Sequence, residues 1–170
     1  MVIDMQGNLY ESMQDKQFLL ENVQKLIRGM QVFGIPVIVT EQIPEKLGPT
    51  IDPVAALLPD ARRIPKSDFS CCGDEKIMKA LKAAERQQVL LCGIETHVCV
   101  YQTAVDLLGF GYDVHLVADA VSSRTVLNRE IGIEKMRDEG ARLASTEMVL
   151  FELIRSADDP KFKEIFKIVK

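Results

Sequence analysis

Short apolar runs alternate with longer amphipathic segments along this whole chain, and this alternation restricts the possible fold more than any other feature. Residues 88–92 are the clearest strand candidate. The segment Lys16–Phe33 carries apolar residues at helical spacing and is ended by Gly34 and Pro36. Such alternation is typical of βαβ units that build a mostly parallel sheet. We therefore expect an α/β fold: a single three-layer α/β/α domain over residues 1–170, with a six-stranded, mostly parallel, Rossmann-like sheet in the order 3-2-1-4-5-6.

The individual elements follow from the same pattern, together with the glycine, proline and capping residues at their ends. Asp74, for example, is expected to be the N-cap of a helix. No internal repeat or low-complexity tract interrupts the series. The expected strands are residues 2–4, 37–39, 61–64, 88–92, 113–118 and 141–144, and the expected helices are residues 16–33, 53–58, 74–84, 97–108, 128–139 and 160–169.

Length and charge favour a small-molecule partner. A chain of 170 residues buries about 70% of the surface that its unfolded form exposes, which is enough for a full core. The formal net charge of -4 gives no electrostatic reason to expect nucleic acid or an acidic membrane surface. The chain also lacks the stretch of about 18 apolar residues that a membrane-spanning helix needs. We expect a small-molecule substrate, no nucleic acid and no membrane partner.

The four cysteines predict a reducing compartment. Cys71 and Cys72 are adjacent and Cys92 lies inside an expected strand, so they lack the spaced framework of a secreted disulfide-rich protein. We expect a cytoplasmic protein. The first strand has few apolar residues before Asp4, which leaves open further upstream residues or an organelle-targeting extension.

Cys99 is the strongest candidate for chemistry. It lies in residues 93–100, GIETHVCV, where an apolar strand is expected to end and a helix to begin. A thiol in the first turn of a helix lies close to the positive end of the helix dipole, which favours the reactive thiolate. Taken alone, a free cysteine is more often a small, buried apolar residue.

Asp4 and Lys66 strengthen the interpretation of Cys99 as a nucleophile. Each follows a short apolar run that predicts a strand of the same sheet. Residues just beyond the carboxyl ends of parallel strands meet in one crevice, which is where ligands bind in open α/β sheets. We therefore expect an acid, an amine and a thiol to meet in one pocket. Considered separately, Asp4 and Lys66 could form a salt bridge at a strand end and nothing more.

Several segments together carry a resemblance to a known family. In chain order they are residues 2–6 (VIDMQ), 65–69 (PKSDF), 93–104 (GIETHVCVYQTA), 111–114 (GYDV), 118–123 (ADAVSS), 151–153 (FEL) and 160–163 (PKFK). With these segments in this order, the chain resembles the cysteine hydrolases of the isochorismatase-like superfamily. It is most similar to their divergent isochorismatase-domain-containing members, and the likeness extends from end to end.

The resemblance implies a role for each residue of the expected pocket. Cys99 would be the nucleophile, Asp4 the general base and later acid, and Lys66 the cation that orients Asp4 and favours the thiolate. It also implies a cis peptide bond between Ile94 and Glu95, and an oxyanion hole formed by the backbone N–H groups of Glu95 and Cys99. The implied activity is metal-independent hydrolysis of a small amide or related acyl compound, through a covalent thioester.

Neither a metal nor another cofactor is expected. His97 and His115 are the only histidines, and His115 falls within an expected strand. Metal-binding amidases of this superfamily, such as nicotinamidases, carry an aspartate and two histidines after the second strand, where this chain has TEQIP at residues 40–44. Isochorismatases proper cleave a vinyl ether and lack the nucleophilic cysteine, so the presence of Cys99 also argues against that reaction.

Other polar and aromatic residues receive weaker assignments. Tyr10, Gln42 and Phe69 are expected near the rim of the pocket as substrate-binding residues. Asp119 is expected to cap or orient the local backbone after the fifth strand.

The resemblance also implies assembly into a homo-oligomer. The short helices after the third and sixth strands offer apolar faces that a monomer would leave in contact with water. Arg124 and Arg129 are expected at the surface or in subunit contacts.

Two other functions stay open at this point. One is a non-catalytic oligomeric binding protein on the same scaffold, and the other is a thiol redox sensor that pairs Cys99 with Cys71 or Cys72. The combination of Asp4, Lys66 and Cys99 favours the hydrolase.

Overall fold

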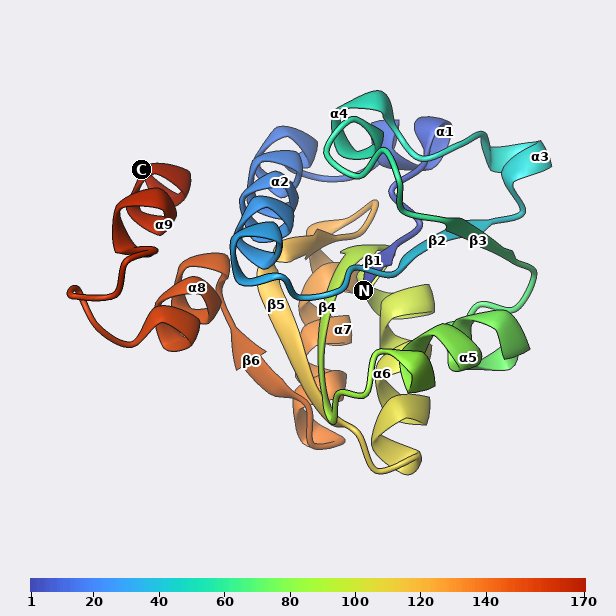
Figure 1. The fold of residues 1–170 in the computed structure, drawn as a ribbon. Coiled ribbons are helices and arrows are strands. Elements are labelled where there is room, and N and C mark those ends of the chain that lie inside the picture. The colour runs from blue at the N-terminus through green and yellow to red at the C-terminus, as the bar shows by residue number, and fades with distance from the viewer.

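The expected six-stranded sheet is confirmed, and all of its strands run parallel. The computed structural model describes residues 1–170. Its strands are β1 (Val2–Ile3), β2 (Val39–Gln42), β3 (Arg63–Lys66), β4 (Gln88–Ile94), β5 (Asp113–Ser122) and β6 (Arg142–Ala144). Their order is β3-β2-β1-β4-β5-β6, as the sequence predicts. Figure 1 shows the sheet running through the middle of the molecule.

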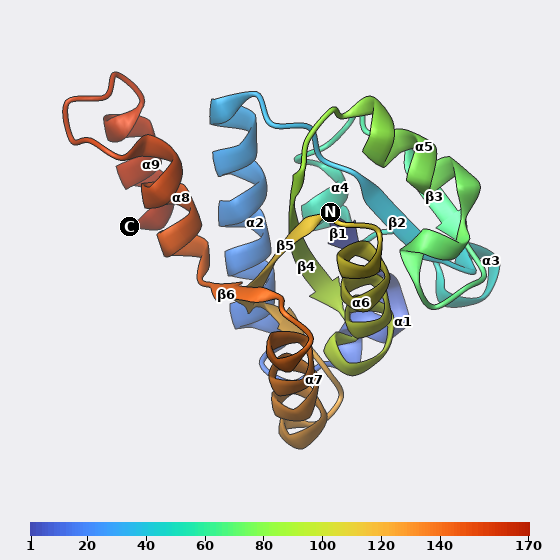
Figure 2. The ribbon, with the colours of Figure 1, turned by 90° about the horizontal axis from the view of Figure 1, so that it is seen from below.

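Helices cover both faces of the sheet, which produces the expected three layers. They are α1 (Gly7–Glu11), α2 (Lys16–Phe33), α3 (Pro44–Leu47), α4 (Asp52–Ala55), α5 (Glu75–Ala83), α6 (Tyr101–Gly109), α7 (Val126–Asp138), α8 (Thr146–Ile154) and α9 (Phe162–Val169), with a 3-10 turn η1 (Cys71–Gly73) and a π turn η2 (Thr96–Val100). In Figure 2, α2, α8 and α9 lie on one side of the sheet, and α5, α6 and α7 lie on the other. None of these helices has both the length and the apolar character needed to cross a membrane.

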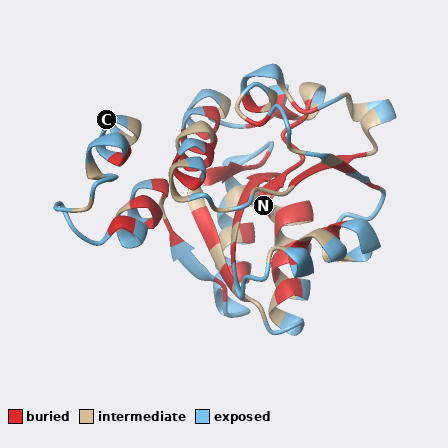
Figure 3. Ribbon diagram, in the orientation of Figure 1, coloured by how far each residue is buried: buried red, intermediate tan, exposed pale blue.

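Two apolar cores, one on each face of the sheet, hold the layers together. Val2 packs into the core beneath α2 and α8, whereas its neighbour Ile3 packs into the core beneath α5, α6 and α7. On β5, Val117 packs into the first of these cores and its neighbour Leu116 packs into the second. Figure 3 shows buried residues concentrated along the strands and on the inner sides of the helices. Strands buried on both faces are nearly continuous apolar runs, which is why the sequence pattern locates the sheet.

Strand boundaries differ from the sequence predictions where polar residues extend a strand. β2 and β3 both begin two residues later than predicted, and β4 and β5 run further, to Ile94 and Ser122. Glu41, Gln42 and Lys66 are buried at the ends of β2 and β3, because other protein groups satisfy their polar atoms. An apolar pattern cannot locate such residues.

The main helices are confirmed apart from shifts at their ends. Asp74 is the N-cap of α5, and its side chain accepts hydrogen bonds from the N–H groups of Lys76 and Ile77 at 2.7 and 3.4 Å. The helix expected after β4 begins with the π turn η2 and becomes regular at Tyr101. The short elements α1, α3 and η1 are not predicted by the pattern, because one or two turns carry no periodicity to recognise.

Gly93 allows β1 and β4 to approach, and this approach sets the place of Asp4. The two strands pair at Ile3 and Gly93. Gly93 has a φ of +114°, and a Cβ atom there would lie 2.0 Å from the carbonyl oxygen of Ile3. Both the backbone conformation and the close contact between strands therefore require glycine.

Gly93→Ala is expected to lower the free energy of unfolding by about 3 kcal/mol or more, because the new methyl group meets a backbone atom and the φ angle is strained. Urea unfolding followed by circular dichroism measures the change. Gly109→Ala is the control, because a Cβ atom there meets nothing within 4 Å, and we expect it to change stability by less than about 1 kcal/mol. A Gly93→Ala protein as stable as the wild type would contradict this account of strand pairing.

Candidate active site

Asp4 lies at the carboxyl end of β1, in a sharp turn of the chain. Its φ of 51° is in the left-handed region, which aspartate tolerates better than most residues. The side chain is fully buried, and Oδ1 accepts a hydrogen bond of 2.8 Å from Thr40 Oγ1 on β2. Oδ2 lies 2.7 Å from Lys66 Nζ and receives no further hydrogen bond. Thr40 thus fixes one carboxylate oxygen, and the other is still able to accept a proton.

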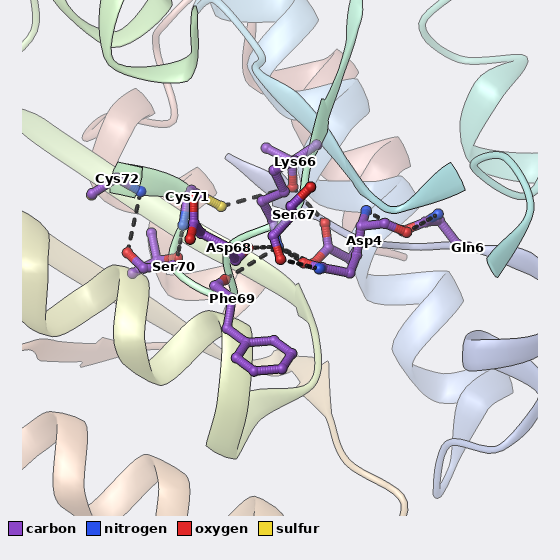
Figure 4. A network of polar contacts seen from close by, with 12 residues as sticks. Asp4, Gln6, Lys66, Ser67, Asp68, Phe69, Ser70, Cys71 and Cys72 are labelled. Carbon is purple, nitrogen blue, oxygen red and sulfur yellow. Dashed lines mark hydrogen bonds and ion pairs between the residues drawn. The ribbon is translucent and has the colours of Figure 1, made fainter. Parts of the chain in front are cut away.

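Lys66 is the last residue of β3, and acceptors surround its ammonium group (Figure 4). Besides the ion pair with Asp4, Nζ donates to Gln42 Oε1 at 2.5 Å and to the carbonyl oxygens of Asp68 and Phe69 at 3.2 and 3.1 Å. Burial by itself lowers the pKa of this lysine, but the ion pair with the negatively charged Asp4 opposes burial, and the pKa of Lys66 is raised overall. Lys66 is therefore a buried cation that keeps its charge at neutral pH.

Cys99 lies in η2, directly after β4, and the structure brings it to Asp4 and Lys66. Burial raises the pKa of its thiol to about 12, the negative charge of Asp4 adds to this rise, and Lys66 opposes it only in part. Burial and Asp4 thus outweigh Lys66, whereas the sequence predicts that Lys66 and the start of the helix favour the thiolate. The resting form is a thiol held beside a carboxylate.

These three side chains can perform nucleophilic chemistry without a preformed thiolate. As sulfur bonds to an electrophilic carbon, the thiol proton becomes acidic, and the neighbouring carboxylate can accept it. Lys66 remains charged meanwhile and holds the carboxylate in place. The arrangement therefore favours proton transfer that accompanies the attack over a reactive thiolate at rest.

The backbone N–H of Glu95 has no partner in the chain. The peptide bond between Ile94 and Glu95 is cis, as the family resemblance implies. The Glu95 carbonyl accepts hydrogen bonds from the N–H groups of Val98 and Val100 at 3.1 and 3.2 Å, whereas the N–H of Glu95 itself donates none. A free N–H at the end of β4, four residues before Cys99, is a suitable donor to an oxyanion.

Arg124 is exposed, as expected of a surface residue, and Arg129 is half-buried, but both also bind other parts of the chain. Arg124 Nε donates to both carboxylate oxygens of Glu95, at 3.1 Å each. Arg129 Nε donates to the carbonyl oxygen of Val121 at 3.0 Å, and its guanidinium also binds the carbonyl oxygen of Ala118. The sequence does not reveal these contacts, because the partners are a distant side chain and backbone atoms.

Of the three expected substrate-binding residues, only Phe69 presents its side chain to solvent. Phe69 is 55% exposed, and its ring projects away from the buried ion pair in Figure 4. Gln42 is buried: its Oε1 accepts from the buried ammonium and its Nε2 donates to the Ser67 carbonyl at 2.7 Å. Tyr10 packs in the core, and its hydroxyl donates to the Lys16 carbonyl at 3.0 Å. Gln42 and Tyr10 therefore bind protein groups, and a substrate-binding role for Phe69 stays a prediction.

Asp119 binds the first residue of a distant helix, α8, whose N-cap is Ser145. Its Oδ1 accepts hydrogen bonds from the N–H and the Oγ1 of Thr146, at 2.8 and 2.9 Å, at the start of α8. The side chain therefore links β5 to the segment after β6, and does not orient the backbone that directly follows it.

No group of three or more histidine, cysteine, aspartate or glutamate side chains is placed to hold a metal ion. At the end of β2, Glu41 Oε1 accepts hydrogen bonds from the N–H and the Oγ1 of Thr50, both at 2.7 Å. His115 lies on β5 with Nε2 3.4 Å from Asp113 Oδ2. The Glu41 carboxylate is thus engaged within the protein.

Thr40 and Gln6 are site residues that the sequence pattern does not identify. Thr40 donates to Asp4. Gln6 brackets the backbone of Gln42: its Oε1 accepts from the Gln42 N–H at 2.7 Å, and its Nε2 donates to the Gln42 carbonyl at 3.1 Å. Both residues are fully buried. Position is the only signal in the sequence, because Thr40, like Asp4, stands near the carboxyl end of its strand. The sequence predicts this strand over residues 37–39, two residues too early, so Thr40 falls outside it and its position near the strand end is not recognised.

Asp4→Asn is expected to make Cys99 react faster with iodoacetamide near neutral pH. The substitution removes the negative charge that raises the thiol pKa, while Lys66 still favours the thiolate. Lys66→Met is expected to slow the reaction, because burial and Asp4 then raise the thiol pKa without the opposing charge of Lys66. Because the thiolate is the reactive form, a lower pKa moves the rise in rate to lower pH. Alkylation rates from about pH 6 to about pH 10, assigned by peptide mass, measure both effects.

Cys72 provides the internal control for this measurement. Burial raises its pKa to about 12, and neither Asp4 nor Lys66 contributes to that shift. Its labelling is therefore expected to be the same in all three proteins. An Asp4→Asn protein in which Cys99 is alkylated at the wild-type rate would contradict the electrostatic account of the site.

Comparison with known proteins agrees with the resemblance seen in the sequence. The isochorismatase domain family matches residues 1–148. Isochorismatase domain-containing protein 2 from Xenopus laevis is 38% identical over 166 residues, which cover 98% of this chain and 80% of that protein. The solved structure described as MAR1 ribonuclease from Caenorhabditis elegans is 37% identical, with a TM-score of 0.92, and the match covers 99% of this chain and 86% of that one. YcaC from Escherichia coli, described as an octameric hydrolase of unknown specificity, is 27% identical, with a TM-score of 0.91 and coverage of 98% of this chain and 85% of that one.

The family model matches most of the chain, and the Xenopus laevis relative is similar over 98% of it. The sheet has the strand order β3-β2-β1-β4-β5-β6. The chain belongs to the isochorismatase family, where it is similar to the isochorismatase domain-containing proteins, and it has the fold of the family's hydrolases.

Proposed function

We propose that this protein is a metal-independent cysteine hydrolase that cleaves a small amide or a related acyl compound through a thioester intermediate. The observation that carries this proposal is the cluster of Asp4, Lys66 and Cys99, which come from the carboxyl ends of β1 and β3 and from the turn after β4. A fully buried ion pair is weak evidence for stability, because both charges must leave water. Its presence beside a thiol with a perturbed pKa supports a catalytic role.

In the first half of the proposed reaction, Cys99 Sγ attacks the carbonyl carbon of the substrate. Asp4 accepts the thiol proton as the C–S bond forms, and the electron pair of the carbonyl π bond moves to oxygen. The N–H of Glu95, together with the predicted second donor, the N–H of Cys99, stabilises this oxyanion. When the oxyanion collapses, Asp4 returns the proton to the leaving nitrogen, the C–N bond breaks and the thioester remains.

In the second half, the same groups act on water. Water attacks the thioester carbonyl while Asp4 accepts its proton, and an oxyanion forms again in the same place. Its collapse breaks the C–S bond, the proton returns to sulfur and the carboxylic acid leaves. Lys66 keeps its proton throughout and holds the Asp4 carboxylate in position.

Other functions have less support from the site. The Caenorhabditis elegans relative is described as a ribonuclease, but a formal net charge of -4 disfavours a polyanionic substrate. Burial raises the pKa of Cys71, and raises that of Cys72 to about 12, so both rest as thiols, and neither forms a disulfide with Cys99. A non-catalytic binding protein has no need of a thiol beside an available carboxylate oxygen.

Cys99→Ala and Asp4→Asn are each expected to reduce amide hydrolysis by about a thousandfold or more, because one removes the nucleophile and the other removes the proton acceptor. Ammonia release from a panel of small primary amides measures the activity. Thermal unfolding of the purified variants shows whether each is folded.

Cys72→Ala is the matched control, and we expect it to hydrolyse amides at the wild-type rate. Full activity of folded Cys99→Ala would disprove the mechanism. Cleavage of single-stranded RNA that persists in Cys99→Ala, with no amide hydrolysed by the wild type, would instead favour a nuclease.

We also propose that the chain forms a homo-oligomer through the outer face of α7. Val126, Leu127 and Ile131 are 50%, 64% and 43% exposed there. Leu127 and Ile131 are four residues apart and so share one face of the helix. A patch of this kind commonly marks a contact with another protein. The octameric assembly described for YcaC supports contact with a second copy.

The double substitution Leu127→Glu with Ile131→Glu is expected to dissociate the oligomer, because charged side chains oppose burial in an apolar interface. Size-exclusion chromatography with light scattering measures the mass. Phe110→Glu, at a residue that is 62% exposed at the end of α6, is the control and is expected to leave the mass unchanged. A monomeric wild type, or an oligomer that survives the double substitution, would refute this assembly.

A further inference from the structure

Every polar group of Glu95 except one forms hydrogen bonds with other residues of the chain. Its carbonyl oxygen accepts two hydrogen bonds from N–H groups of η2, and its carboxylate oxygens accept hydrogen bonds from Arg124. Only the backbone N–H, the expected oxyanion donor, has no partner. The side chain is 9% exposed, so the carboxylate is held almost entirely within the protein.

Arg124 holds this carboxylate through both its side chain and its backbone. Nε donates to Oε1 and Oε2 of Glu95 at 3.1 Å each, and the backbone N–H of Arg124 donates to Oε2 at 3.3 Å. Arg124 is itself anchored, because its carbonyl accepts a hydrogen bond of 3.2 Å from Gln14 Nε2. His97 Nδ1 is 3.9 Å from Glu95 Oε2 but lies closer to Ser123 Oγ, at 3.0 Å. Arg124 is therefore the main partner of the carboxylate, and the pair ties the turn after β4 to the loop after β5.

We infer that Arg124 is a positioning residue that holds the N–H of Glu95 in place as an oxyanion donor. The inference rests on the proposed function, which supplies the oxyanion. The carboxylate and the N–H belong to the same residue, so hydrogen bonds that fix the side chain also restrict rotation of the backbone. A donor that is already oriented stabilises the developing charge more than one that must reorient during the reaction. Arg124 thus acts through Glu95 and does not contact the reacting atoms.

Two reagents separate oxyanion stabilisation from the reactivity of the thiol. In the reaction with p-nitrophenyl acetate, Cys99 sulfur adds to the acetyl carbon, its proton passes to Asp4, and an oxyanion forms. Collapse of the oxyanion expels p-nitrophenolate and leaves an acetyl thioester. Iodoacetamide alkylates the same sulfur by displacing iodide, without addition to a carbonyl group. The ratio of the acylation rate to the alkylation rate therefore reports on the oxyanion donor alone.

Arg124→Ala is expected to slow acylation of Cys99 about tenfold or more, and to change alkylation by less than about twofold. Arg124→Lys keeps the positive charge but lacks the planar guanidinium, so its acylation rate is expected to lie between those of wild type and Arg124→Ala. Arg137→Ala is the matched control, because Arg137 is an exposed arginine of α7 that pairs only with Asp138. Cys99→Ala gives the background rate of each reagent.

A fall in acylation that is confined to the Arg124 variants supports the inference. An unchanged rate ratio in Arg124→Ala overturns it and leaves the proposed hydrolase intact. A parallel fall of both rates also overturns it, because Arg124 then supports the site in general and not the oxyanion donor. A wild-type protein that p-nitrophenyl acetate does not acylate at Cys99 overturns both the inference and the proposed function.

Discussion

The buried ion pair between Asp4 and Lys66 is the interaction on which the candidate site depends. It joins β1 to β3 across β2, which lies between them in the sheet. Burying a charged group away from water costs roughly several kcal/mol unless other polar groups form hydrogen bonds with it. Thr40 and Gln42 of β2 supply those groups, one for each partner. The carboxyl end of β2 must therefore be polar, although it is buried.

The same pair determines the chemical state of Cys99. Asp4 is close enough to raise the pKa of the thiol, and Lys66 does not compensate for burial. The protein thus holds Cys99 as a thiol beside the Asp4 carboxylate, and in the proposed reaction the thiol loses its proton only as it attacks the substrate. A neutral thiol reacts more slowly with oxidants and other electrophiles than a thiolate, so Cys99 is less prone to oxidation in this state.

Much of this architecture could be predicted from the sequence because parallel strands that are buried on both faces are nearly continuous apolar runs. Asp4, Lys66 and Cys99 could be singled out because each follows such a run, at the edge where α/β sheets bind ligands. Thr40 and Gln6 could not, because β2 continues through polar residues that interrupt the apolar pattern. Arg124 could not either, because its partner Glu95 is 29 residues away and no local pattern connects them.

By itself, the sequence determined the α/β class, the order of the elements along the chain and the acid, amine and thiol that meet at one edge of the sheet. Only the tertiary structure decided that Cys99 rests as a thiol, that Gln42 binds Lys66 and that Arg124 holds Glu95. The physical reason is that local sequence controls backbone conformation and the periodicity of burial. Protonation and hydrogen bonding depend instead on desolvation and on distances between groups that are far apart in the chain.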